Sequence, residues 1–207
     1  MSILVAISGG SGSGKTTLAE MVAERLGSDR AASLQFDSYY VDQAHRTPEE
    51  RAAVNYDHPE SLDHRLFAEH LEALRAGREA AVPVYDFATH SRTADVHIVE
   101  PRPVVVADGI LLLAYPELVA TFDLRVYRAC PEPVRFERRL ARDIADRGRT
   151  ADSVHAQFAA TVKPMHDEFV APSQAHADIV TRHGEEELDA ATERVLAAID
   201  ALVTTRT

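Results

Sequence analysis

Cysteine is almost absent from this chain. Cys130 is the only cysteine among 207 residues, which excludes an internal disulfide and any zinc site built from several cysteines. No histidine pair has the HExxH spacing of a zinc site. No apolar run approaches the ~20 residues that a membrane-spanning helix requires. The first ten residues, MSILVAISGG, lack the basic flank and cleavage site of a signal peptide, so we expect a cytoplasmic protein with no membrane partner.

Lysine is also scarce, because the 22 basic residues comprise 20 arginines and only Lys15 and Lys163. We therefore expect each lysine to stand at a position that needs a lysine in particular. The 33 acidic residues give a net charge of −11, which repels a nucleic-acid backbone, so we expect no nucleic-acid partner. The hydrophobic fraction of 45% is typical of a globular protein, and the length predicts one domain, residues 1–207.

Short apolar runs alternate with helical patterns along the chain. The runs at 3–7, 31–36, 104–107, 124–126 and 179–180 predict buried strands. Apolar residues at helical spacing predict helices over 18–26, from Ser61 to Gly77, after Pro131 and around 188–199. This alternation predicts an α/β domain of three layers with a central parallel sheet. Residues about 80–100 instead alternate apolar and polar side chains, which predicts a small β-hairpin insertion that covers the substrate.

A glycine-rich segment, GGSGSGKTT, follows the first predicted strand and precedes a predicted helix. It fits the pattern GxxxxGK[ST], in which backbone N–H groups and the helix N-terminus face phosphates. The alternative is a flexible turn before an ordinary helix. We expect this loop to bind a nucleoside triphosphate through Gly9, Gly10, Ser11, Gly12, Ser13, Gly14, Lys15, Thr16 and Thr17.

Two predicted strands end in a carboxylate. Asp108 follows the run VVVA, and with the Thr16 hydroxyl it is the candidate ligand for Mg²⁺ beside the phosphates. Asp37 follows the second strand and is placed to accept a proton from an acceptor hydroxyl. For both residues the alternative is a turn aspartate at a strand end. Because the chain lacks the NKxD signature of small GTPases, we expect a small kinase.

Seven strings together resemble those of uridine kinases, or more broadly uridine-cytidine kinases. They occur in the order seen in that family and span most of the chain: GGSGSGKTT, DSYY, NYDHPESLD, VPVYDFATHSR, DGILLL, RRLARDIADRGR and VKPMHDEFVAP. The resemblance implies a P-loop kinase fold and ATP-dependent, Mg²⁺-assisted transfer to the 5'-hydroxyl of uridine or cytidine. It leaves GTP open as a donor and implies a homo-oligomer, often a tetramer.

The resemblance also implies roles for residues around the acceptor. Asp37 of DSYY would be the catalytic base, with Tyr40 beside it. In NYDHP, Asp57 would accept a ribose hydroxyl, and Tyr56 would lie against the base at a position usually occupied by Phe. The nucleobase pocket would be formed by Tyr85, Phe87 and His90.

The arginine-rich string resembles the lid of these kinases, at about 134–160. The catalytic arginines would be Arg139 and Arg142, with Arg139 also near the substrate, and Arg147 and Arg149 would contact the donor. Gln157 resembles a further ribose contact. The alternative is a solvated helix whose arginines pair with Glu137, Asp143 and Asp146. That interpretation is the better account of Arg135 and Arg138.

Two positions depart from the family pattern. Asp108 stands where relatives usually carry Glu, which leaves the metal preference open, and the hydroxyl of Tyr56 must be satisfied at the pocket wall. Two other functions also stay open. One is a related P-loop kinase acting on another hydroxylated metabolite, such as pantothenate or a sugar phosphate. The other is a nucleotide-binding regulatory module that has lost turnover.

Overall fold

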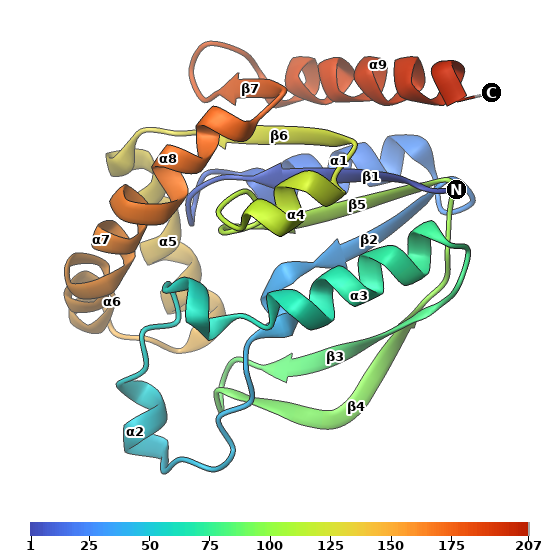
Figure 1. Cartoon of the computed structure of the whole chain (residues 1–207). Coiled ribbons are helices and arrows are strands. Elements are labelled where there is room, and N and C mark those ends of the chain that lie inside the picture. Colours follow the sequence, from blue (N-terminus) through green and yellow to red (C-terminus); the bar gives the residue numbers. More distant parts are fainter. Residues whose placement is uncertain (207) are drawn as a thin grey trace.

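A twisted parallel sheet lies at the centre of the computed structural model, which describes residues 1–206 (Figure 1). Its strand order is β2-β5-β1-β6-β7, and every pairing between neighbours is parallel. The strands are β1 (Ile3–Ser8), β2 (Ala31–Gln35), β5 (Val104–Gly109), β6 (Leu124–Ala129) and β7 (Ile179–Arg182). The predicted α/β class with a central parallel sheet is thereby confirmed.

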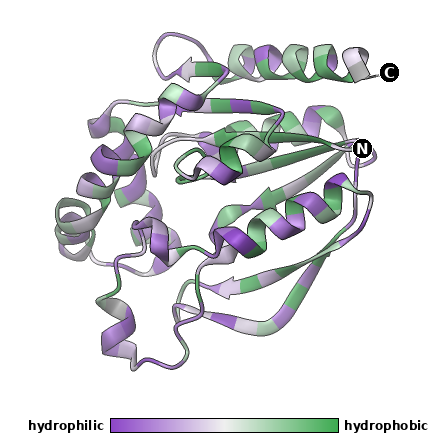
Figure 2. Ribbon diagram, in the orientation of Figure 1, coloured by the Kyte–Doolittle hydropathy of each residue, from purple (hydrophilic) through white to green (hydrophobic). Residues whose placement is uncertain are grey.

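Helices cover both faces of this sheet. The strand β1 alternates between them, with Val5 on one face and Leu4 on the other. On the first face pack α1 (Lys15–Leu26) and α9 (Leu188–Arg206); on the second pack α3 (His64–Arg75) and α4 (Pro116–Thr121). Figure 2 shows hydrophobic residues concentrated along the central strands, which are buried on both faces.

The strands β3 (Ala80–Asp86) and β4 (Ser91–Val99) form a separate antiparallel hairpin. It lies below α3 in Figure 1 and buries Val82 and Tyr85 against the rest of the molecule. Pro83 pairs with Val96, and the register shifts between Pro83 and Tyr85. A proline is tolerated there because a two-stranded sheet has edges on which an N–H group is not required.

The chain after β6 forms a helical arm that is interrupted once, at residues 148–150. It comprises α5 (Glu132–Arg147), α6 (Ala151–Gln157), α7 (Lys163–Met165) and α8 (Ala171–Ser173), with wide helical turns at Phe158–Val162 and His166–Val170. Each wide turn precedes a proline, Pro164 or Pro172. A proline lacks the N–H group that would bond the carbonyl four residues earlier, and that carbonyl lies inside the wide turn in both cases.

Ser61 does not start the helix that we predicted from it. Residues Pro59–Ser61 form a short 3-10 turn and Leu62 is extended, because Leu62 bridges to Tyr40. The helix begins one turn later, where the side chain of Asp63 accepts a hydrogen bond from the N–H of Leu66 at 3.1 Å. The short helix α2 (Pro48–Ala52) was missed, although its start has a sequence signal: Thr47 and Glu50 form a capping box, and Pro48 is the first helical residue. Within residues 1–206 no helix is both long and apolar enough to cross a bilayer.

We predict that Phe67→Ala lowers the free energy of unfolding by about 3–5 kcal/mol. Phe67 is fully buried, with its ring 4.5 Å from that of Phe36 and 4.9 Å from that of Tyr39. Urea unfolding followed by circular dichroism measures the change. The control is Val96→Ala, since Val96 is 56% exposed and its truncation should change stability by less than about 0.5 kcal/mol. Similar values for the two variants would contradict this packing.

Candidate active site

The loop between β1 and α1 wraps tightly enough that only glycine fits at key positions. Gly12 has a φ of 79°, and a Cβ there would lie 2.2 Å from the carbonyl oxygen of Arg135. Gly14, with a φ of 87°, precedes the first residue of α1, Lys15. A glycine has no side chain to cap the helix, so the first N–H groups of α1 stay available to an anion. This loop is therefore built as a phosphate cradle.

Thr16 and Asp108 meet beside that cradle. The parallel pairing of β1 with β5 sets Ile7 opposite Asp108, at the carboxyl ends of both strands. There the Thr16 hydroxyl donates to Asp108 Oδ2 at 2.7 Å. Burial raises the pKa of Asp108 above its usual range, while Lys15 opposes that rise. A hydroxyl and a carboxylate at one point supply the oxygen ligands that Mg²⁺ prefers, so these residues fit the metal expected here.

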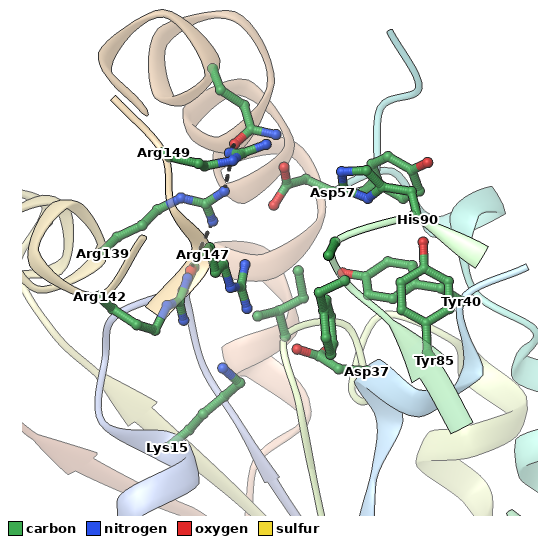
Figure 3. Close-up of a pocket in the computed structure, with 16 residues that line it drawn as sticks. Lys15, Asp37, Tyr40, Asp57, Tyr85, His90, Arg139, Arg142, Arg147 and Arg149 are labelled. Carbon is green, nitrogen blue, oxygen red and sulfur yellow. Dashed lines mark hydrogen bonds between the residues drawn. The ribbon is translucent and has the colours of Figure 1, made fainter. Parts of the chain in front are cut away.

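One cavity of about 240 Å³ joins the phosphate loop to the hairpin (Figure 3). Among the predicted site residues, fourteen line it: Ser11, Lys15, Asp37, Tyr40, Tyr56, Asp57, Tyr85, Phe87, His90, Arg139, Arg142, Arg147, Arg149 and Gln157. The remaining predicted residues do not line this cavity. They lie in the loop, in the first turn of α1 or at the end of β5: Gly9, Gly10, Gly12, Ser13, Gly14, Thr16, Thr17 and Asp108.

Two carboxylates face the cavity. Asp37 lies on the 3-10 turn Phe36–Tyr39 that follows β2, and its Oδ1 is buried with no hydrogen-bond partner within residues 1–206. Asp57 is 7% exposed, and its Oδ2 accepts a hydrogen bond from the Thr161 hydroxyl at 3.4 Å. Burial raises the pKa of Asp57, an effect that the nearby Arg139 opposes. Both side chains therefore retain acceptor capacity for a ligand.

Aromatic rings form the wall opposite the loop. The ring of Tyr40 lies 5.1 Å from Tyr85 and 5.7 Å from Tyr56, and Tyr56 stacks on His90 at 4.7 Å with planes 15° apart. The Tyr56 hydroxyl donates to the carbonyl of Arg51 at 3.0 Å, so the polar group that departs from the family pattern is satisfied. Of these pairs, only Tyr40 and Tyr56 meet edge to face, and all four rings line the cavity, where they offer flat surfaces to a ligand.

His90 is held in an unusual backbone conformation. Its φ of 53° is the only positive value for a residue other than glycine within residues 1–206. Such conformations cost about 1–3 kcal/mol and cluster at ligand sites. Burial lowers the pKa of His90, and Arg149 and Arg147 lower it further, so the ring is neutral at pH 7. A neutral imidazole can donate one hydrogen bond and accept another.

Arg92 ties the hairpin to the turn that carries Asp37, a role that sequence reasoning missed. Its Nε donates to the Tyr40 carbonyl at 2.9 Å, and its Nη2 donates to the Tyr39 carbonyl at 3.1 Å and approaches Asp63 at 3.3 Å. The residue stands in the string VPVYDFATHSR, of which only the aromatic and histidine positions had been assigned roles. The position of Arg92 in the sequence did not indicate that it contacts the turn at Phe36–Tyr39.

Arginines from α5 and the segment after it close the third side of the cavity. Arg139 donates to the Ser11 hydroxyl and to Gln157 Oε1, each at 2.9 Å, and Arg149 also donates to Gln157. The Arg147 guanidinium lies 5.0 Å from the centre of the Phe87 ring. This cation–π contact joins the arginine-rich arm to the hairpin across the cavity mouth.

The interpretation of α5 as a solvated helix is wrong for two of its residues. Arg135 is 3% exposed, and its Nε donates to the carbonyl of Cys130 at 3.1 Å behind the phosphate loop. The Asp143 carboxylate is completely buried. Arg138 is exposed, as that interpretation expected. Arg135 and Asp143 are buried by the phosphate loop and by the chain that follows Gly148. The apolar periodicity of α5 alone contains no information about those segments.

A second cavity, of about 370 Å³, lies between the loop and the segment that joins β7 to α9. Its walls come from the loop, the end of β6, α5 and that joining segment: Ser13, Gly14, Thr17, Arg128, Arg138, His183, Gly184, Glu186, Glu187 and Leu188. Only its three loop residues had been predicted. The other residues come from separate segments that share no motif, so their spacing along the chain provided no reason to group them.

This fold and phosphate loop define the class: the protein is a P-loop kinase. More particularly, the chain belongs to the phosphoribulokinase / uridine kinase family, whose model matches residues 4–189. The family resemblance drawn from the seven strings is confirmed.

Its relatives and structural neighbours agree with this assignment. It is 42% identical over 202 residues to a uridine kinase of Chloroflexus aurantiacus, covering 96% of this chain and 97% of the relative. It is 42% identical over 182 residues to a uridine kinase of Clostridium perfringens, covering 88% of each. Phosphoribulokinase from Rhodobacter spheroides has the same fold, with a TM-score of 0.65 and 14% identity over 87% of this chain and 70% of that one.

We predict that Asp57→Asn raises the free energy of unfolding at pH 7 by about 1 kcal/mol. Because burial raises the folded-state pKa of Asp57, the charged form is penalised at every pH above that pKa. The gain should shrink as the pH falls through the folded-state pKa toward the ordinary aspartate range. Urea unfolding at several pH values measures it, with the exposed Asp95→Asn as control. A loss of stability at pH 7 would mean that attraction to Arg139 outweighs the burial penalty.

Proposed function

We propose that this kinase transfers the γ-phosphoryl group of ATP to the 5'-hydroxyl of uridine or cytidine and so forms UMP or CMP, a step of pyrimidine salvage. The observation that carries the proposal is that Lys15 and Asp37 line the same cavity as Tyr85 and His90. Two relatives named uridine kinase, each 42% identical to this chain, support the same reaction.

In this proposal the donor lies along the phosphate loop. The N–H groups after Gly12 and the Lys15 ammonium bind its phosphates, while the second cavity receives its base. Thr16 and Asp108 would hold Mg²⁺, which when bound neutralises charge on the phosphate oxygens. The shorter Asp108 already reaches the Thr16 hydroxyl, so replacement of the family's usual Glu leaves the pair intact.

The acceptor hydroxyl is positioned by Asp37. As the bond between the 5'-oxygen and the γ-phosphorus forms, the bond from that phosphorus to the β–γ bridging oxygen breaks and ADP leaves. The hydroxyl proton passes to Asp37, whose Oδ1 has no other partner within residues 1–206. Arg139 and Arg142 contribute positive charge on the facing wall, where negative charge is redistributed during transfer.

The rest of the nucleoside contacts the aromatic wall and Asp57. The buried carboxylate of Asp57 accepts a ribose hydroxyl, and the rings of Tyr40 and Tyr85 line the slot for the pyrimidine. Neutral His90 can hydrogen-bond to the edge of the base. A base with the wrong edge leaves such a group unpaired, at a cost of about 1–3 kcal/mol, and a purine is too large for the slot.

An assay that couples ADP release to a coloured product tests this function. With ATP as donor, we expect turnover with uridine or cytidine and none with adenosine, ribose or pantothenate. Turnover with adenosine or pantothenate but with neither pyrimidine nucleoside would reject the proposal in favour of a related kinase. Tight ATP binding without turnover on any acceptor would indicate a regulatory module.

We predict that Asp37→Asn lowers kcat by about 10²–10⁴-fold and leaves the affinity for ATP within about threefold of wild type, because the amide cannot take the proton. Steady-state kinetics and calorimetric titration with ATP measure the two quantities. Asp95→Asn makes the same change of charge on the exposed face of β4 and should leave both unchanged. An Asp37→Asn enzyme with wild-type kcat would exclude Asp37 as the base.

A further inference from the structure

Asp143 is a completely buried carboxylate in α5, surrounded by four guanidinium groups. Arg142 Nη2 lies 2.8 Å from its Oδ1, and Arg139 Nε lies 3.4 Å from its Oδ2. Arg147 Nη1 and Arg149 Nη1 follow at 3.7 and 3.9 Å. One anionic side chain thus touches all four arginines of the arm that face the cavity.

The local sequence produces this arrangement. Arg139 and Arg147 stand four residues before and four after Asp143, so all three share one face of the helix. Gly148, with a φ of 62°, ends α5 in the left-handed region. The chain then turns back, and the N–H of Arg149 donates to the Asp143 carbonyl at 3.1 Å. That turn returns the Arg149 side chain to the same carboxylate.

The cluster has more positive charge than its carboxylate can balance. Four guanidinium groups against one carboxylate leave a surplus of three positive charges, and the arginines line the cavity while Asp143 does not. Burial and the neighbouring Arg142 lower the pKa of Arg147, as expected where like charges are crowded. Across the cavity the phosphate loop faces the same space (Figure 3). The surplus suits an anion with several negative charges, such as a triphosphate.

Helix stability alone is a poor explanation for this carboxylate. An exposed ion pair four residues apart contributes little to stability and needs only one cation. Burying a carboxylate has a large desolvation cost, and replacing a buried ion pair with apolar groups often stabilises a protein. The completely buried Asp143 therefore has an energetic cost that a solvated acid on the same helix would not have.

We propose that Asp143 is a positioning residue, which holds the guanidinium groups of Arg139, Arg142, Arg147 and Arg149 converged on the cavity before the phosphates arrive. Its role in turnover rests on the proposed function, since these arginines act on the group being transferred. Arginines already in place need little reorganisation during transfer, and a displacement of about 1 Å can lower a rate about 10²-fold. Asp143 acts through them and does not touch the substrate.

The test compares Asp143→Asn, Asp143→Glu and the matched control Asp146→Asn. Asp146 lies on the same helix and is exposed, so its variant makes the same change in net charge outside the cluster. For each variant we would measure the melting temperature, the Kd for ATP without nucleoside, and kcat with whichever pyrimidine nucleoside the wild type phosphorylates. The rise in melting temperature caused by inorganic tripolyphosphate gives a readout that does not depend on any acceptor.

For Asp143→Asn we expect kcat to fall about 10–100-fold, while the Kd for ATP stays equal to that of wild type or becomes lower. The charge surplus rises from three to four, so anions are still attracted, but the guanidinium groups are no longer held in place. For the same reason tripolyphosphate should raise its melting temperature by more than that of wild type. We expect Asp143→Glu to fold, to bind ATP normally and to have an intermediate kcat, and Asp146→Asn to match wild type throughout.

Three results would overturn the proposal. The first is an Asp143→Asn enzyme with kcat within threefold of wild type. The second is a parallel loss of ATP affinity and kcat in that variant, which a general structural defect would cause. The third concerns the case in which Asp143→Asn does not fold. A folded Asp143→Glu enzyme with wild-type kcat would then show that Asp143 has only a structural role. If the wild type phosphorylates neither pyrimidine nucleoside, the proposed function fails, whereas ATP affinity and the tripolyphosphate shift still test Asp143.

Discussion

Parallel pairing of β1 with β5 brings segments far apart in sequence to one edge of the sheet. The register that sets Ile7 opposite Asp108 places the phosphate loop beside the acid at the end of β5. The pairing of β2 with β5 brings Gln35, and the turn with Asp37 after it, to the same edge. In open parallel sheets ligands bind at the carboxyl ends of the strands, so this hydrogen-bonding pattern fixes where the cavity forms. The hairpin and the arginine-rich arm then close its sides.

The residues around the cavity carry energetic costs that the rest of the fold must offset. Burial penalises the charged forms of Asp57 and Asp108, His90 has an unfavourable backbone conformation, and Asp37 has a buried oxygen without a partner in the described chain. Two clusters of buried hydrophobic side chains, one on each face of the sheet, supply the compensating stability. Groups that lack partners before a ligand arrives are the ones that can bind it, so the same features lower stability and provide recognition.

Several features were predictable because they depend on residues close in sequence. The glycine loop and the buried strands follow from spacing and hydrophobic runs, and both are present. The start at Ser61 was wrong because a bridge between Leu62 and Tyr40, distant in sequence, keeps the chain extended. Arg92 and the second cavity were missed because their contacts join separate segments. The expected homotetramer and the individual roles of the site residues stay predictions.

The α/β layers, the glycine-rich loop and the family could all be predicted from the sequence. Glycine positions, helix ends and apolar periodicity act through the local backbone, so they can be interpreted one segment at a time. Which polar side chains are buried depends on how distant segments pack together, and it became clear only from the folded structure. Whether Asp143 is solvated or enclosed by arginines depends on where the chain goes after Gly148, and whether His90 shares a cavity with Lys15 depends on how the hairpin packs. Burial is a property of everything packed around a group, and no short stretch of sequence contains that information.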